Sequence, residues 1–251
     1  MELAGDEAPL VLRAAVESGV NHIDTAQYYG PVVVNELIRE ALHPYPSDVA
    51  IVSKVAARRE TGGAALRQGI EANLDTLGAG RLAAVNLRIM DPSAPPDKGF
   101  DTQLAALIKA REEGLIDGIG VSNVSRRQLL RALEHTEIVC VQNLFNVADQ
   151  GSLDVLKECT ARNIAFVPFC PLGWPRGQLL ASPVLAAIAA RLSATPAQIA
   201  LAWLLDLAPN ILLIPGTSTR AHLTENLHAA DIQLDAAARA ELTRRGEHAH
   251  A

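Results

Sequence analysis

The segment that decides the fold spans residues 49–87: it begins VAIVSK (49–54), continues AALRQGIEANLDTL (64–77) and ends LAAVNL (82–87). The first and last runs are short and almost entirely apolar, which is typical of parallel strands buried on both faces. The middle run is amphipathic with the periodicity of a helix. The segment therefore predicts a strand, a helix and a second strand parallel to the first.

The same alternation recurs along the chain, in units of about 25–35 residues of the kind that builds α/β folds. Strand-like runs lie at 21–24, 49–54, 82–87, 117–121, 138–142, 164–168 and 211–215, and helical patterns lie between them at 36–42, 64–77, 102–113, 126–134 and 153–161. No GxGxxG motif follows a strand, which favours a TIM (β/α)8-type barrel over a dinucleotide-binding open sheet. No linker or low-complexity segment interrupts the pattern, so residues 1–251 are predicted to form a single domain.

The strand count is one short of a closed barrel, which needs eight strands. Seven runs are identifiable, and a helix predicted at 7–18, ending at Gly19, precedes the first of them. We expect either that residues 1–3 supply a remnant of the first strand or that the first strand is missing. Two outcomes are expected: either the first few residues and a neighbouring strand close the gap in a distorted ring of seven strands, or the chain is marginally stable and weakly active.

Composition narrows the classes of protein and of partner. The chain has 251 residues, a formal net charge of −6 and 49% hydrophobic residues. It lacks a lysine- and arginine-rich run, which argues against a nucleic-acid partner. No apolar stretch reaches the roughly 18 residues of a membrane helix, and no signal peptide is evident. Three scattered cysteines without CxxC spacing indicate a reducing compartment and no structural zinc, so a cytoplasmic protein is expected.

Polar side chains stand where the predicted strands end. Asp24, Lys54 and Asn86 close the first three runs, and Tyr29 follows Asp24 by five residues. In an α/β barrel the carboxyl ends of the strands converge on one rim, and the chemistry is found there. We therefore expect these four side chains to share a site.

These residue types form a plausible proton donor. A phenol has a pKa of about 10, and a nearby ammonium group lowers it by favouring the phenolate. A buried lysine needs an anion close by, and Asp24 is available for Lys54. With Tyr29 beside them, the set could protonate a carbonyl oxygen.

Six segments of the chain resemble the aldo-keto reductase family, in order and in spacing. They are GVNHIDTAQYYG (19–30), IVSKV (51–55), GIGVSN (118–123), VQNLFN (141–146), PFCPLG (168–173) and IPGTSTRAHLTEN (214–226). The resemblance covers nearly the whole chain, and it implies NADPH-dependent reduction of an aldehyde or ketone on a TIM barrel. It makes Tyr29 the general acid, Lys54 the group that lowers its pKa, and Asp24 the partner of Lys54.

The resemblance also implies a set of cofactor contacts. Ser122, Asn123 and Gln142 correspond to residues that hold the nicotinamide carboxamide, Phe169 to the aromatic residue that stacks on the ring, Cys170, Pro171, Leu172 and Gly173 to a pyrophosphate segment, and Glu225 and Asn226 to adenine contacts. Phe169 stands where the family often has tyrosine, and phenylalanine can still stack.

Two further departures from the family pattern affect the chemistry. Asn86 stands where a histidine is common, and an amide can donate a hydrogen bond but cannot transfer a proton. Gly216 and His222 stand where a lysine and an arginine often bind the adenosine phosphate. Thr217, Ser218 and Arg220 lie close in sequence and could compensate, so we expect a modest preference for NADPH, with NADH as the alternative cofactor.

The asparagine variant and the DTA-x-YYGP context resemble a bacterial subgroup that includes pyridoxal reductases, which points to a small aldehyde substrate. Two other readings stay open. The chain could be a nicotinamide-nucleotide-binding module that senses redox state, or an inactive, truncated reductase. Asp24 could merely cap a turn, and Asn86 with Arg88 could be an ordinary polar rim.

Overall fold

The structure is a computed structural model, and it describes residues 7–30, 33–175 and 177–247. The chain divides into two compact units. The first comprises Met1–Val141 with Ser218–Arg220, and the second comprises Gln142–Thr217 with Ala221–Ala251. Most of the predicted proton-donor residues belong to the first unit, so its sheet is the element that positions them.

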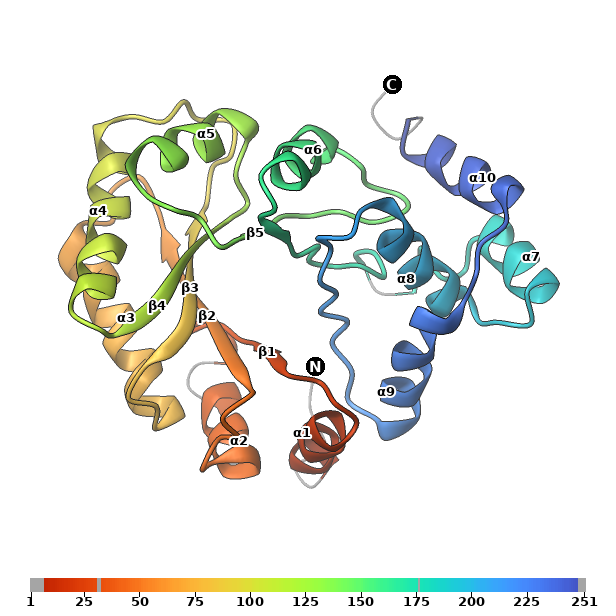
Figure 1. The fold of residues 1–251 in the computed structure, drawn as a ribbon, viewed down its shortest axis with the longest axis horizontal. Coiled ribbons are helices and arrows are strands. Elements are labelled where there is room, and N and C mark those ends of the chain that lie inside the picture. Colours follow the sequence, from red (N-terminus) through yellow and green to blue (C-terminus); the bar gives the residue numbers. More distant parts are fainter. Residues whose placement is uncertain (1–6, 31–32, 176, 248–251) are drawn as a thin grey trace. The chain divides into compact units, whose positions relative to one another are not determined.

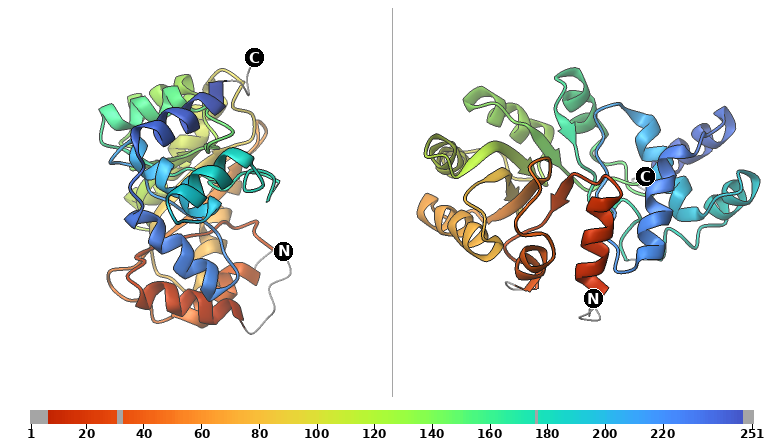
Figure 2. Two further views of the ribbon diagram at one scale, coloured as in Figure 1. Left: turned by 90° about the vertical axis from the view of Figure 1, so that its right-hand side faces the viewer. Right: turned by 60° about the horizontal axis from the view of Figure 1, so that its bottom comes forward.

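The first unit alternates helices and strands, as predicted (Figure 1). Its elements are α1 (Glu7–Glu17), β1 (His22–Asp24), α2 (Val33–Leu42), β2 (Ala50–Ala57), α3 (Gly63–Leu77), β3 (Leu82–Ile89), α4 (Lys98–Glu112), β4 (Ile116–Ser122) and α5 (Arg126–His135), and β5 (Cys140–Gln142) begins at its end. Strands β1 to β4 are hydrogen-bonded in sequence order and are parallel. Figure 2 shows from two further directions that α3, α4 and α5 lie along one side of β2 to β4.

The two faces of this sheet differ sharply in chemistry. On one face of β2 and β3 the side chains are buried and mainly apolar, as at Val55 and Leu87, with Ser53 as a polar exception, and Val55 faces α3 across Gly69. Because side chains alternate along a strand, even-numbered residues leave the opposite face. Lys54 is the register partner of Asn86, and Asn86 of Gly120. Strand register therefore places the polar side chains of Lys54 and Asn86 side by side on this face; we call the two residues the polar row.

Local signals explain the helix boundaries. Gly78 adopts a left-handed φ of 63° and ends α3 by donating its N–H to the carbonyls of Asp75 and Leu74, as expected for a C-terminal glycine. Asp97 caps α4 by accepting from the N–H groups of Gly99 and Phe100. Helix α4 begins at Lys98, four residues before the predicted start; its first turn is mainly polar, and Phe100, which is buried in line with Leu104 and Leu107, was the apolar signal that the prediction missed.

The second unit is mainly helical within the described residues. Its elements are α6 (Leu153–Ala161), β6 (Ala165–Phe166), α7 (Pro183–Arg191), α8 (Pro196–Leu207), α9 (Arg220–Leu227, with Arg220 in the first unit), the 3-10 helix η1 (His228–Asp231) and α10 (Ala236–Glu247). Trp203 stacks on Phe145 with ring centroids 6.0 Å apart, and Phe145 meets Phe166 edge to face at 5.7 Å. Trp203 is 1% exposed and belongs to the core of this unit.

The predicted seventh strand at 211–215 is wrong as an extended strand. Within the described residues it is a single parallel bridge between Phe166 and Ile211, in which the Leu212 N–H donates to the Phe166 carbonyl at 2.9 Å. Pro215 has no N–H to donate, and β6 is only two residues long, so a longer ladder has few partners. The expected remnant at residues 1–3 lies outside the described residues.

In the ranges that the structure describes, no single helix is long and apolar enough to cross a membrane. Only α7 and α8 taken together reach that length and apolarity, and the pair is bent by 87°.

Candidate active site

Lys54 is the central charged group of the first unit. Its side chain is 1% exposed, and its Nζ donates to Asp24 Oδ2 and to the Thr25 carbonyl, both at 2.7 Å. A buried ammonium is tolerated only where an anion and hydrogen-bond acceptors replace water. The structure therefore brings together the pair that the sequence predicted. Asp24 ends β1 as expected, but β2 runs to Ala57, so the prediction that Lys54 closes its strand is wrong. The catalytic role of the pair stays a prediction.

Tyr29 lies against the same ammonium. Lys54 Nζ is 5.0 Å from the centroid of the Tyr29 ring, which is the range of a cation–π contact. The Tyr29 side chain is 39% exposed, so a small molecule can approach it from solvent. The chain turns at the next residue, Gly30, with a φ of 46°. Asp24, Lys54 and Tyr29 thus form one cluster.

Tyr28 stands beside Tyr29, with the rings edge to face and 5.4 Å between centroids. Burial raises the pKa of Tyr28 above its usual value, and Arg88 opposes that effect. A phenol with a raised pKa is harder to ionise.

A buried polar network lies behind Lys54. The Thr25 hydroxyl donates to Asn35 Oδ1 at 2.8 Å, and Asn35 Nδ2 donates to Asn73 Oδ1 at 3.1 Å and to Thr76 Oγ1 at 3.0 Å. The Ser53 hydroxyl also donates to Asn73 Oδ1, at 2.6 Å. The network joins α2 and α3 to the carbonyl that Lys54 contacts and to the residue before Lys54. It therefore fixes both the stem and the acceptor of the ammonium.

Asn86 lies in the same polar row and is 1% exposed. Its Oδ1 accepts a hydrogen bond from the Cys140 thiol, with 3.3 Å between oxygen and sulfur. Its Nδ2 is buried and has no hydrogen-bond partner among the residues described. Buried polar groups are usually paired, so an amide N–H left over at this position calls for an explanation.

The end of β4 carries two of the predicted cofactor contacts. Arg88 Nη1 donates to the Ser122 hydroxyl at 3.2 Å, across paired positions of β3 and β4. Asn123 has a left-handed φ of 56°, and its Nδ2 donates to the Ile89 carbonyl at 2.8 Å. Ser122 and Asn123 are therefore both held by the end of β3, beyond Asn86, which lies within that strand. Their contact with nicotinamide stays a prediction.

The remaining predicted cofactor residues of the second unit lie on loops and at element ends. Gln142 ends β5, and Gly216 and Thr217 lie between the bridge at Ile211 and α9. Phe169 donates its N–H to the Asn143 carbonyl at 2.9 Å. The segment Cys170, Pro171, Leu172 and Gly173 is a tight turn, with the Gly173 N–H bonded to the Cys170 carbonyl at 2.9 Å and with φ values of 51° at Cys170 and 84° at Gly173.

The predicted adenine and phosphate residues gather on α9. Glu225 accepts a hydrogen bond from the Thr195 hydroxyl, and Gln198 Nε2 donates to the Glu225 carbonyl at 3.1 Å. These bonds fasten α9 to the start of α8, so Glu225 has a structural role in addition to any contact with adenine. Asn226 is half-buried and His222 is exposed. In the first unit, Ser218 is half-buried and Arg220 is exposed.

Sequence reasoning missed the residues that support this cluster from behind: Thr25, Asn35, Ser53, Asn73 and Cys140. One signal was available for two of them. Ser53 and Asn73 interrupt runs that are otherwise apolar on the packed face, and a polar residue at such a position needs a partner. Nothing in the sequence indicated that Ser53 and Asn73 are bonded to each other.

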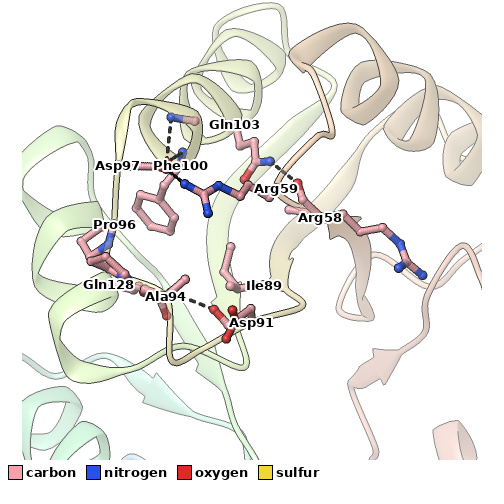
Figure 3. A pocket seen from close by; sticks show the side chains of 13 residues that line it. Arg58, Arg59, Ile89, Asp91, Ala94, Pro96, Asp97, Phe100, Gln103 and Gln128 are labelled. Carbon is pink, nitrogen blue, oxygen red and sulfur yellow. Dashed lines mark hydrogen bonds and ion pairs between the residues drawn. The ribbon is translucent and has the colours of Figure 1, made fainter.

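A hollow of the first unit opens at the ends of β2 and β3, beside the start of α4 (Figure 3). Ile89 and Phe100 supply apolar surface there. Gln103 Nε2 donates to the Arg58 carbonyl at 2.6 Å, and Gln128 Nε2 donates to the Ala94 carbonyl at 3.0 Å. These amides brace the surrounding loops, so we assign no ligand to the hollow.

Comparison with known proteins gives a consistent result. The model of the aldo/keto reductase family matches residues 2–245. Pyridoxine 4-dehydrogenase of Escherichia coli K12 is 45% identical over 234 residues, which is 89% of this chain and 81% of that protein. An uncharacterized oxidoreductase of Schizosaccharomyces pombe is 36% identical over 247 residues, which is 94% of this chain and 78% of that protein.

Solved structures agree on the fold. The thermostable aldo-keto reductase Tm1743, in complex with the inhibitor epalrestat, has a TM-score of 0.85 and 32% identity, and the match covers 96% of this chain and 88% of that one. An aldo-keto reductase from Klebsiella pneumoniae in complex with NADPH has a TM-score of 0.82 and 28% identity, over 96% of this chain and 84% of that one. The predicted α/β fold class is confirmed.

Proposed function

This chain belongs to the aldo/keto reductase family and is therefore an oxidoreductase, and from that premise we propose that it reduces an aldehyde or ketone to the alcohol, with NADPH as the reductant. The observation that carries the proposal is the buried Lys54 ammonium, which contacts the Asp24 carboxylate on one side and the Tyr29 ring on the other. That cluster has the charge arrangement that proton donation by a phenol requires.

Tyr29 is the proton donor in this proposal. Its hydroxyl gives a proton to the carbonyl oxygen, and the phenolate left behind is stabilised by the Lys54 ammonium. Asp24 holds that ammonium in place, with 2.7 Å between Nζ and Oδ2. Partial exposure of Tyr29 lets the substrate reach the hydroxyl, while Lys54 stays buried at 1% exposure.

Asn86 is the second donor to the carbonyl oxygen. Its buried Nδ2 has an N–H without a partner in the described residues, on the sheet face that carries Lys54. An amide can donate a hydrogen bond without giving up a proton. We assign Asn86 the tasks of orienting and polarising the carbonyl, and we leave proton transfer to Tyr29.

NADPH is the proposed cofactor, because relatives of known structure are complexes with NADPH and with NADP. When bound, it supplies the hydride that reduces the carbonyl carbon. On this proposal Ser122, Asn123 and Gln142 hold the carboxamide, and Phe169 packs against the ring. The turn from Cys170 to Gly173 would offer backbone to the pyrophosphate. Arg220, which is exposed at the first turn of α9, would pair with a phosphate.

A small aldehyde is the proposed substrate class. The E. coli relative is named for acting on pyridoxine at its 4-position, and the reverse of that oxidation reduces the corresponding aldehyde. Pyridoxal is therefore the first substrate to test. The partly exposed phenol of Tyr29 is compatible with the approach of a small, polar ring compound.

The test follows binding and turnover separately. Purified protein is titrated with NADPH by fluorescence, pyridoxal is then added, and the loss of cofactor absorbance is followed. We expect Tyr29→Phe to keep NADPH affinity within a few-fold and to lose about 10²–10⁴-fold in turnover. Tyr28→Phe is the matched control and should keep most of the activity.

Two outcomes would overturn the proposal. Binding of NADPH with no turnover of any aldehyde would favour a nucleotide-binding, redox-sensing module. Neither binding nor turnover would favour an inactive chain. Full activity in Tyr29→Phe would leave the reductase assignment standing but would remove Tyr29 as the acid.

A further inference from the structure

The carboxamide of Asn86 is buried and half-satisfied. Its oxygen accepts from the Cys140 thiol at 3.3 Å, while its NH2 group has no partner in the part of the chain that the structure describes. Rotating the amide by half a turn would exchange oxygen and nitrogen. The thiol would then face an NH2 group, and sulfur accepts hydrogen bonds only weakly. The thiol proton therefore favours the orientation in which the amide oxygen faces Cys140.

The Cys140 thiol can donate a hydrogen bond at any physiological pH. Cys140 is 6% exposed and lies one strand beyond Gly120, on the side of the sheet that Asn86 faces. Burial, reinforced by the negative charge of Asp24, raises the pKa of the Cys140 thiol to about 12. The thiol keeps its proton across the physiological range, so it can donate to the amide oxygen and does not act as a nucleophile.

Gly120 provides the space in which the two groups meet. A Cβ at Gly120 would lie 2.1 Å from Asn86 Oδ1 and 2.6 Å from Cys140 Sγ. Distances this short are forbidden, so any side chain here would displace the amide, the thiol or both. The glycine, the cysteine and the asparagine together define one position for the amide oxygen.

The orientation matters because of what lies beside it. Asn86 is the register partner of Lys54, so both side chains leave the same sheet face on adjacent strands. With the oxygen held by Cys140, the unpaired group is a donor, which suits a carbonyl oxygen. With the amide reversed, the unpaired group would be an acceptor and would repel that oxygen.

We propose that Cys140 is a positioning residue, whose S–H group holds the Asn86 amide so that its NH2 group is offered to the substrate carbonyl. This inference rests on the proposed function, since it concerns the same site. It assigns a task to a residue that touches neither substrate nor cofactor.

The test is a double-mutant cycle with Cys140→Ala and Asn86→Ala, using NADPH and pyridoxal. Cys140→Ala should lower kcat about tenfold and leave the Kd for NADPH unchanged. In the Asn86→Ala background, Cys140→Ala should have no further effect on kcat, because the residue acts only through the amide. Cys140→Ser keeps a donor at the same place and should stay within about threefold of wild-type kcat.

Cys159→Ala is the matched control. Cys159 is also a fully buried cysteine, but it lies on α6, outside the first unit. The Cys159→Ala variant should lose about as much stability as the Cys140→Ala variant and should keep the wild-type kcat. Equal losses of kcat from Cys140→Ala in both backgrounds would show a general structural effect and would overturn the proposal. A serine variant as slow as the alanine variant would overturn it as well.

The failure of the proposed function is distinguishable from the failure of this inference. If the wild-type protein reduces no carbonyl compound, the proposed function is wrong. Urea unfolding then compares the four proteins of the cycle: wild type, Cys140→Ala, Asn86→Ala and the double variant. If the thiol contacts the amide, the effects of the two single substitutions on the free energy of unfolding are not additive. Additive effects would mean that the thiol does not hold the amide.

Discussion

Lys54 and Asn86 are register partners on adjacent parallel strands, so the ammonium and the carboxamide leave the sheet on the same face. Both side chains are 1% exposed, which means that the sheet holds them away from solvent. Two donors of different strength, one charged and one neutral, are thereby placed one strand apart. A carbonyl oxygen bound near Tyr29 would meet this row.

Removing the charge of Lys54 should cost both stability and turnover. Lys54→Met leaves Asp24 without its buried partner, and breaking such a pair costs about 3–5 kcal/mol. Turnover should fall about 10²–10³-fold, as when one electrostatic stabiliser of developing charge is removed. Urea unfolding and steady-state kinetics measure the two effects.

The double variant Lys54→Met with Asp24→Asn separates these effects. It removes the uncompensated carboxylate, so it should recover most of the lost stability and none of the lost turnover. Recovery of turnover in the double variant would contradict the role of Lys54.

The network behind Lys54 should support both folding and catalysis. Asn73→Ala removes the oxygen that accepts from Ser53 and Asn35. Each buried group left unpaired costs about 1–3 kcal/mol, so a loss of that order is expected in the free energy of unfolding. Thr102→Ala, on the exposed side of α4, is the control and should change stability by less than about 0.5 kcal/mol. An Asn73→Ala protein as stable as this control would show that the network contributes little.

Stability should fall at alkaline pH in a manner that depends on Cys140. The folded state raises the pKa of this thiol from 9.0 to about 12. The unfolded chain therefore loses the proton at lower pH than the folded one. The stabilising contribution is complete below pH 9 and is lost as the pH rises toward 12.

Urea unfolding of wild type and Cys140→Ser at pH 8 and pH 10 tests this sign. Burial also raises the pKa of Tyr28, which acts in the same direction in both proteins. The difference between wild type and variant isolates the thiol, and the wild type should lose more stability over this interval. An equal loss in the two proteins would show that the thiol titrates normally.

Cofactor preference should depend on Arg220. The position is exposed at the start of α9, where a guanidinium can pair with a phosphate through two hydrogen bonds. We expect NADPH to bind more tightly than NADH by a modest factor, and Arg220→Ala to narrow the ratio of the two Kd values. Arg244→Ala on α10 is the control and should leave the ratio unchanged. Equal affinity for both cofactors in the wild-type protein would refute this expectation.

Parallel strands and helices were predictable from the sequence because they depend on local patterns. The predicted strand ends at Lys54 and Asn86 were three residues early, since β2 and β3 continue to Ala57 and Ile89. Apolar runs bounded by helical periodicity located β1 to β4 within a few residues. The exception is the segment 211–215. A β strand needs hydrogen-bonding partners, and Pro215 together with a neighbouring strand of only two residues leaves few such partners. Family resemblance supplied the assignment of Tyr29, Lys54 and Asp24.

The sequence by itself determined the α/β class, the family and the membership of the cluster of Asp24, Lys54 and Tyr29, because periodicity, composition and motif spacing are properties of the chain itself. Only the tertiary structure decided that Thr25, Asn35, Asn73 and Ser53 form one network, and that Cys140 meets Asn86 beside Gly120. Those contacts join residues up to 54 positions apart. They depend on strand register and on the side of the sheet from which each side chain leaves. A hydrogen bond forms only within about 3.5 Å, and that separation is a property of the packed molecule.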